Sequence, residues 1–236
     1  MAVDASILPA RAPRAAGERR RRIAAAALCC CAWPIATLAA DAAQADGASN
    51  WTFRVLLDGR PIGEHHYRIT RSADGSADAV LSEASFTVHW LGITLYRYRH
   101  RAAERWRGNC LVALAADTDD NGQRTRVAAS LQGDTFEVSA PAPLSVRGCV
   151  MSFAYWNPAL RSQRRLLNAQ TGGLESVTMV PIEEGSVESR GRPAGATGLR
   201  LGGLAQPITL WYSPSGDWLG LDTRVDGGRL LSYRLP

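Results

Sequence analysis

A two-residue alternation between positions 96 and 107 constrains the fold of this chain more than any other feature. One side carries aromatic rings, a histidine and a carboxylate, from Tyr96, Tyr98, His100, Ala102, Glu104 and Trp106. The other side is a row of arginines at positions 97, 99, 101, 105 and 107. Successive side chains of a strand point to opposite faces, so this segment is predicted to be one long strand. Its aromatic face is unusual for a hydrophobic core and is compatible with the wall of a cavity.

The rest of the chain repeats the strand pattern, with turn residues roughly every eight to twelve positions, which is typical of an all-β protein. The strands are expected at 51–57, 62–71, 80–90, 93–107, 110–117, 123–131, 135–140, 175–182, 199–204, 208–212, 218–225 and 229–235. A polar and Gly-rich connection is expected from 183 to 195. We therefore predict a curved antiparallel sheet, or an open or closed β-barrel.

One segment, 151–167, has apolar spacing that fits a short helix. The residue before a proline avoids the α region, so the helix is expected to break at Asn157-Pro158. Its aromatic residues Phe153, Tyr155 and Trp156 are expected to plug one end of the barrel.

The first 45 residues have the three parts of a secretory signal. Arginines at 11, 14 and 19–22 precede an apolar run from Ile23 to about Leu38, and Ala43-Gln44-Ala45 forms a cleavage site. We expect cleavage after Ala45 and a single periplasmic or otherwise exported domain over 46–236. Export by the general or the twin-arginine route stays open, and contact with a membrane is expected only through the leader.

Charge does not indicate a nucleic-acid partner. Six arginines and three acidic residues lie in the leader, and the remainder, with 21 Arg against 19 Asp and Glu, is nearly balanced. The basic side chains form no cluster typical of a nucleic-acid-binding domain. The oligomeric state cannot be predicted.

Two cysteines remain after cleavage, Cys110 and Cys149. In an oxidising compartment such a pair is expected to form a disulfide, with two buried thiols or a metal pair as alternatives. Neither has the C-x-x-C spacing with a nearby histidine that marks a zinc site.

Six residues are the candidate ligand contacts: Tyr96, Tyr98, His100, Glu104, Trp106 and His65. His100 and Glu104 lie four positions apart, about 13 Å along an extended strand, so they are expected to face one cavity without touching. His65 and His66 are expected on opposite faces of a strand, so no metal site and no cofactor are predicted.

Residues 117–122, Asp-Thr-Asp-Asp-Asn-Gly, match the first half of a calcium loop. Position twelve of such a loop falls on Ala128, so we expect a hairpin turn at Asn121-Gly122 with a solvated acidic cluster. Weak calcium binding is the alternative. No nucleophile elbow, phosphate-binding loop or dinucleotide fingerprint is present.

The segments DGRPIGEHHYRI, LGITLYRYRHRAAERW, ADTDDNG, LLNAQTG and WYSPSGDWLGL together resemble an uncharacterised family of exported bacterial β-rich proteins of unknown function. The resemblance covers nearly all of the chain after the leader. Its recurrent positions fall here on Gly63, His65, Tyr96, Tyr98, His100, Glu104, Trp106, Asp119, Asp120, Asn121 and Gly122. It implies an envelope protein loosely similar to lipoprotein carriers and lipocalin-like half barrels, without an established activity.

The preferred hypothesis is a non-enzymatic module that holds an apolar or amphiphilic, lipid-like molecule in a β-barrel cavity. Tyr96, Tyr98 and Trp106 would bury its apolar part, and His100 and Glu104 would place its polar end. A small hydrolase or isomerase using His100 or His65 with Glu104 is the first alternative. An envelope assembly or structural factor whose arginine face docks on an anionic partner is the second.

Overall fold

The computed structural model describes residues 49–72 and 78–236. The predicted leader and its cleavage site lie outside these residues. The strands are β1 (Ser49–Leu57), β2 (Arg60–Thr70), β3 (Asp78–Trp90), β4 (Ile93–Arg107), β5 (Cys110–Asp120), β6 (Gln123–Gln132), β7 (Thr135–Ala140), β8 (Leu144–Arg147), β9 (Arg165–Leu167), β10 (Leu174–Ser176), β11 (Thr178–Ser189), β12 (Arg192–Gly202), β13 (Ile208–Tyr212), β14 (Trp218–Val225) and β15 (Arg229–Arg234). Two short 3₁₀ helices, η1 (Pro158–Ser162) and η2 (Asp226–Gly228), complete the described elements.

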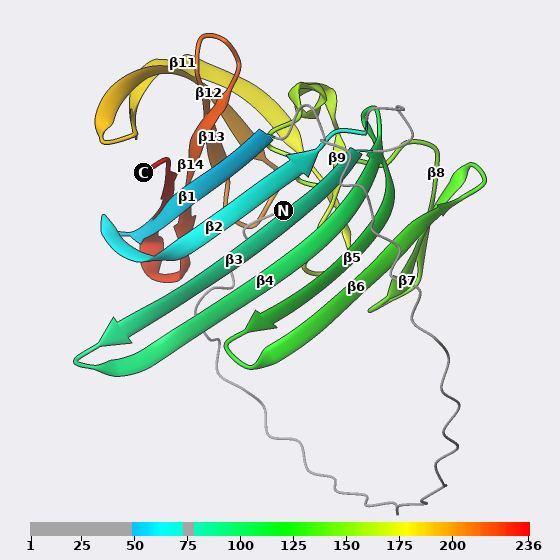
Figure 1. Ribbon diagram of the computed structural model, residues 1–236, viewed down its shortest axis with the longest axis horizontal. Helices are drawn as coiled ribbons and strands as arrows, with labels where there is room; N and C mark the ends of the chain where they lie inside the picture. The colour runs from blue at the N-terminus through cyan, green and yellow to red at the C-terminus, as the bar shows by residue number, and fades with distance from the viewer. Residues whose placement is uncertain (1–48, 73–77) are drawn as a thin grey trace, which may run out of the picture. The chain divides into compact units, whose positions relative to one another are not determined.

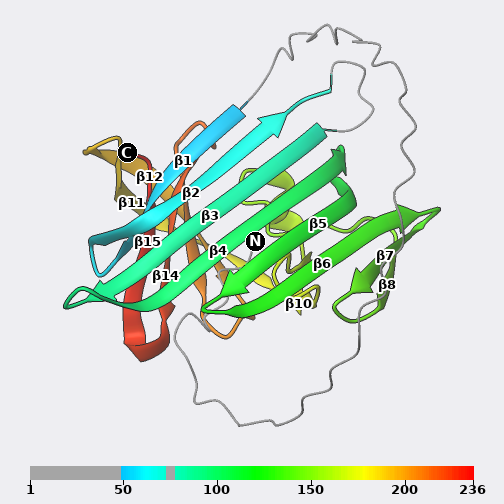
Figure 2. The same cartoon turned by 60° about the horizontal axis from the view of Figure 1, so that its bottom comes forward.

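Thirteen of these strands form one antiparallel sheet in the order β11-β12-β13-β14-β15-β1-β2-β3-β4-β5-β6-β7-β8. The last strand, β15, pairs with the first, β1, so the two ends of the described chain meet in the middle of the sheet. The sheet curls without closing, because β8 and β11 end it on either side, and Figures 1 and 2 show this open curl. The predicted all-β fold is confirmed in its open form.

The long strand predicted from the alternation is β4, and its two faces are separated as expected. Its aromatic and polar side is buried from Tyr96 to Trp106, and its arginines are exposed. Because a strand alternates with a period of two, this one segment determines the inner and outer faces of the sheet around it.

One of two local predictions is wrong. The expected connection over 183–195 is a long hairpin, β11 and β12, turned at Arg190-Gly191. Much of β11 is exposed on both faces at the edge of the sheet, so its sequence lacks the alternation that marks a half-buried strand. The expected break at Asn157-Pro158 is present, because Asn157 is extended and helix η1 begins only at Pro158. Asn157 caps it by accepting the Ala159 N–H at 2.9 Å, and proline suits the first helical position because its missing N–H needs no partner.

The hydrophobic core lies on the inner face of the curl. The segment from Val150 to Gln170 covers part of this face, and nearly all of its apolar side chains are buried. Trp156 packs edge-on against Trp106 at 5.4 Å between ring centroids, and Tyr155 packs against Trp218 at the same distance. Among residues 49–72 and 78–236, no helix is long and apolar enough to cross a membrane.

Candidate functional site

The six predicted ligand residues all point to the inner face of the sheet. Five come from β4, and His65 comes from β2, two strands away. All six side chains are buried, and Tyr98 stacks on Phe86 with ring centroids 5.1 Å apart. Structure therefore brings them together as one aromatic and polar layer of the core. Their binding of a ligand remains a prediction.

Two histidines stand in the same row of this layer. His65 pairs with Ala84 on β3, and Ala84 pairs with His100 on β4. His65 Nε2 is 2.8 Å from the Ser82 hydroxyl, and His100 Nδ1 is 2.8 Å from the Thr118 hydroxyl. One ring nitrogen of each histidine is therefore held by a neighbouring strand.

The other ring nitrogen of each histidine has no hydrogen-bond partner within the described residues. These atoms are Nδ1 of His65 and Nε2 of His100, on side chains that are 1% and 3% exposed. Burial lowers the pKa of His100 to about 3 and holds the pKa of His65 well below its usual range. Both rings are neutral near pH 7, and each offers one unused donor or acceptor to a small polar group.

Glu104 occupies a separate part of the same face. Its carboxylate accepts a hydrogen bond from Trp106 Nε1 at 2.9 Å and a second from the Ser152 hydroxyl. Burial raises the pKa of Glu104, and these two hydrogen bonds oppose the shift. The predicted pair of His100 and Glu104 shares a face, but the two residues have different partners.

A cleft of about 700 Å³ lies at the rim of the curl. We call it the rim cleft. Its walls come from the first residues of β1, the turn between β11 and β12, and the start of β14. The apolar lining includes Trp51, Trp218, Leu219 and Leu235, and the polar lining includes Arg190, Arg192 and Asp217.

The charges of the rim cleft are unevenly neutralised. Asp217 accepts a hydrogen bond from the Ser215 hydroxyl at 2.8 Å, and the Ser213 hydroxyl lies 3.3 Å away. Arg190 and Arg192 take part in none of the ion pairs formed by the described residues. The volume is within the range of small-molecule sites, and the two arginines leave a net positive charge beside an apolar wall.

Sequence reasoning missed the rim cleft. Trp51 and Arg190 are far apart along the chain, and the Arg190-Gly191 turn fell inside the segment read as a connection. The tryptophan was a visible signal, but no sequence pattern placed it beside the β11–β12 turn.

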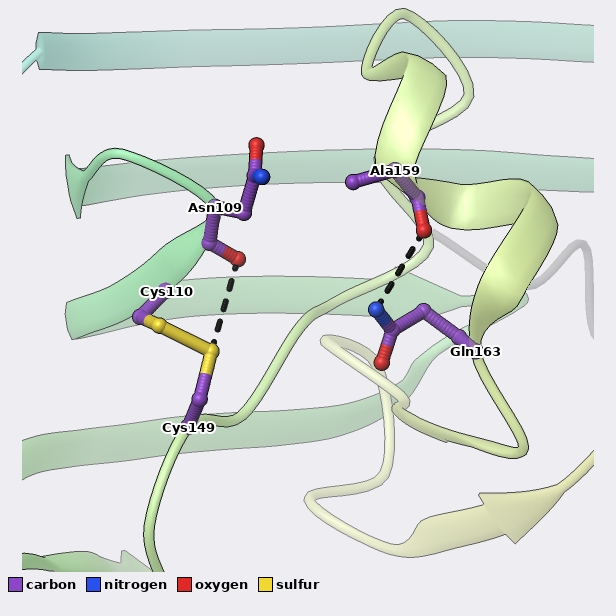
Figure 3. Close-up of a disulfide and its surroundings, with 5 residues drawn as sticks. All are labelled: Asn109, Cys110, Cys149, Ala159 and Gln163. Carbon is purple, nitrogen blue, oxygen red and sulfur yellow. Dashed lines mark hydrogen bonds between the residues drawn. A yellow bond between two sulfur atoms is a disulfide. The ribbon is translucent and has the colours of Figure 1, made fainter.

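The disulfide between Cys110 and Cys149 is present, as predicted (Figure 3). It joins the start of β5 to the chain that follows β8, and the Leu111 N–H donates to the Val150 carbonyl at 2.8 Å beside it. Figure 3 also shows the η1 turn nearby, where Gln163 Nε2 donates to the Ala159 carbonyl at 3.2 Å. The crosslink fixes the start of the segment that covers the inner face.

The acidic cluster at 117–122 forms a hairpin turn, as expected. Asp119 accepts the Gly122 N–H at 2.8 Å and pairs with Arg124 at 3.2 Å, and Asp117 pairs with Arg126 at 2.8 Å. Among the described residues, no group of three or more histidine, cysteine or acidic side chains is arranged to hold a metal ion.

Comparisons with known proteins agree with this fold. One solved structure, described as a beta-barrel-like protein of domain of unknown function DUF1849 from Brucella abortus, matches with a TM-score of 0.54 and 12% sequence identity. The match covers 79% of this chain and 94% of that one, and at this identity it supports the fold alone. No curated protein matches the chain. A family profile described as a domain of unknown function (DUF6134) matches residues 53–236, so the chain belongs to the DUF6134 family.

Proposed function

We propose that this protein is an exported, non-enzymatic binding module for an amphiphilic, lipid-like molecule that carries an anionic group. The observation that carries the proposal is the rim cleft, in which an apolar wall meets Arg190 and Arg192. An apolar wall with a few placed polar groups is the usual composition of a small-molecule site.

The two arginines support an anionic ligand group. A guanidinium presents several N–H donors in a plane, which matches the oxygens of a phosphate or carboxylate. Because neither side chain is engaged in an ion pair with a described residue, no intramolecular partner has to be displaced. Asp217 lies in the same lining, so Arg190, Arg192 and Asp217 together carry a net charge of +1.

The aromatic wall connects the rim cleft to the inner layer. Trp218 lines the cleft and packs against Phe53 and Tyr67 at 4.3 and 5.2 Å between ring centroids. Tyr67 in turn stacks on His65 at 4.2 Å. These ring contacts link the rim cleft to His65, so the predicted inner residues are retained as the deeper part of the proposed site.

The enzyme alternative has less geometric support. General acid–base catalysis needs groups within hydrogen-bond reach of one substrate. Glu104 is instead engaged by Trp106 and Ser152, and it lies four residues along the strand from His100, about 13 Å away. The geometry therefore favours binding without turnover.

Titration calorimetry with octyl phosphate tests the proposal, with octyl glucoside as the uncharged comparison. We expect octyl phosphate to bind more tightly, and the double variant Arg190→Gln/Arg192→Gln to weaken it by about tenfold or more, as the loss of charge-assisted hydrogen bonds predicts. A matched control, Arg165→Gln/Arg200→Gln, removes the same charge from exposed positions outside the cleft and should leave binding unchanged.

Native mass spectrometry of gently purified protein gives an independent check. A discrete amphiphile that co-purifies with the wild type and is lost in Trp51→Ala would support the carrier function. Equal affinity of the arginine variant and its control, together with turnover that disappears in His100→Ala, would overturn the proposal in favour of an enzyme.

A further inference from the structure

The hairpin of β3 and β4 extends beyond its neighbours. The pairing of β2 with β3 ends at Gly63 and Phe86, and the pairing of β4 with β5 ends at Tyr98 and Asp120. Beyond those rows, residues 87–90 pair with residues 93–97 and with no other described strand. Figure 1 shows this hairpin projecting past the strands on either side. We call residues 87–97 the hairpin tip.

The hairpin tip exposes large apolar side chains to solvent. Trp90 is 62% exposed, Leu91 86%, Ile93 65% and Leu95 52%. Elsewhere in the described residues, comparable exposure of a large apolar side chain occurs only at Val180 and Leu230, which lie far apart. A cluster of such side chains at a projecting end marks a contact surface, since single scattered ones would need no explanation.

The turn of the hairpin tip does not itself require a leucine. Four two-residue turns in this structure have positive φ at both positions: Asp58-Gly59, Leu91-Gly92, Asn121-Gly122 and Arg190-Gly191. Asparagine and aspartate suit the first position because they tolerate the left-handed conformation, and a polar side chain there is also well solvated. Leu91, with φ of 48°, satisfies neither preference. The turn conformation therefore does not account for the leucine side chain.

Positive charge lies directly behind the apolar end. From residue 84 to residue 103 the chain has no aspartate or glutamate, whereas Arg97 and Arg99 are exposed and form no ion pair among the described residues. The adjacent acidic turn neutralises only part of this charge. Asp119 pairs with Arg124 and lies across from Arg99, whose charge also lowers the pKa of Asp119, and Asp120 accepts the Tyr96 hydroxyl.

We propose that the hairpin tip docks on the surface of an anionic lipid bilayer. Trp90, Leu91 and Ile93 enter the boundary between headgroups and acyl chains. Ile93 and Arg97 are four residues apart, about 13 Å along a strand, so an insertion of 5–10 Å leaves the arginine at the level of the anionic headgroups. Tryptophan at this boundary, with arginine on the aqueous side, is the usual order of interfacial anchors.

A bilayer fits this surface better than a protein partner. A stable protein interface buries about 800 Å² on each side, arranged as a broad complementary patch. The hairpin tip is only two strands wide, so its apolar side chains form a narrow surface that suits insertion into a lipid layer. This inference does not depend on the rim cleft, which lies at the opposite end of the strands, where Ser49 aligns with Ile69.

Vesicle flotation of the protein without its predicted leader tests the docking. We expect binding to vesicles of phosphatidylethanolamine with phosphatidylglycerol, and weaker binding to vesicles of phosphatidylcholine alone. The variant Leu91→Asn/Ile93→Thr should lose at least about tenfold in partitioning, because two apolar side chains that would enter the bilayer are replaced. Leu91→Asn preserves the turn, so loss of folding does not explain the result.

The matched control is Val180→Thr/Leu230→Asn, which replaces two exposed apolar side chains away from the hairpin tip. It should bind vesicles as the wild type does. Absence of wild-type binding to anionic vesicles, equal binding to the neutral ones, or equal loss in the control would overturn the proposal. Capture of a specific protein that depends on Leu91, without vesicle binding, would assign the surface to that protein.

Discussion

His65 and His100 lie in one row of the sheet, two strands apart, with the methyl side chain of Ala84 between them. Each is tied to a hydroxyl on a neighbouring strand and keeps its other ring nitrogen unpaired. A buried polar atom without a partner costs about 1–3 kcal/mol. Because two such atoms lie in one row, this row is the inner end of the proposed binding site.

The two buried histidines should make stability fall at acidic pH. Their folded-state pKa values are below the unfolded value of 6.5, so the unfolded chain takes up protons first as the pH decreases. The contribution of His100 to the free energy of unfolding is fully present above about pH 6.5 and is lost between there and about pH 3, by up to about 1.4 kcal/mol per pH unit. His65 contributes a loss in the same direction. We expect the free energy of unfolding of His100→Gln, measured with urea, to change less with pH over this range than that of the wild type. The same pH dependence in His100→Gln as in the wild type would contradict this account.

Glu104 should make the protein less stable as the pH rises, the opposite of the effect of the two histidines. Its pKa is raised in the folded state, so its contribution is most favourable below the model-peptide value of 4.5 and becomes unfavourable as the pH rises. Glu104→Gln retains an acceptor for the Trp106 N–H and cannot ionise. We expect the variant to gain stability relative to the wild type between pH 4.5 and 8, measured by urea unfolding. A difference that does not change with pH, or the same gain in the outer-face variant Glu83→Gln, would contradict this account.

Removal of the disulfide should lower the free energy of unfolding by several kcal/mol. Cys110 and Cys149 are 39 positions apart, and the chain-entropy model for a loop of that size gives about 4 kcal/mol. Cys110→Ser/Cys149→Ser is therefore expected to unfold at a markedly lower urea concentration. The reduced wild type should match the double variant, and a difference between the two would show that the serine substitutions have an effect of their own.

The turn of the hairpin tip should tolerate a polar residue better than its own leucine. Leu91→Asn is expected to leave the free energy of unfolding unchanged or to raise it by up to about 1 kcal/mol, because asparagine adopts positive φ more readily. The melting temperature should be unchanged or higher. Gly92→Ala has open space for its methyl group but a φ of 79°, so it should destabilise by about 1 kcal/mol. A destabilised Leu91→Asn would indicate that the leucine stabilises the isolated fold.

The alternation in β4 was sufficient to predict which side chains face inward. A period of two is a local property, so Tyr96, Trp106 and the opposing arginines were assigned correctly without any tertiary information. The Asn121-Gly122 turn was equally local, because its backbone conformation selects its residues. Where alternation was absent, as in β11, the strand was missed.

The sequence by itself predicted the faces of the alternating strands and the turn residues between them, and it favoured a disulfide between the two cysteines. Tertiary structure alone decided which strands are neighbours, and therefore that His65 shares a row with His100 and that Trp51 lies beside Arg190. It also decided that β2 and β5 stop short of the β3–β4 turn, which leaves Leu91 in solvent. The physical reason is that alternation specifies the side of a residue, whereas its neighbours depend on hydrogen-bonded register between segments that are distant in the chain.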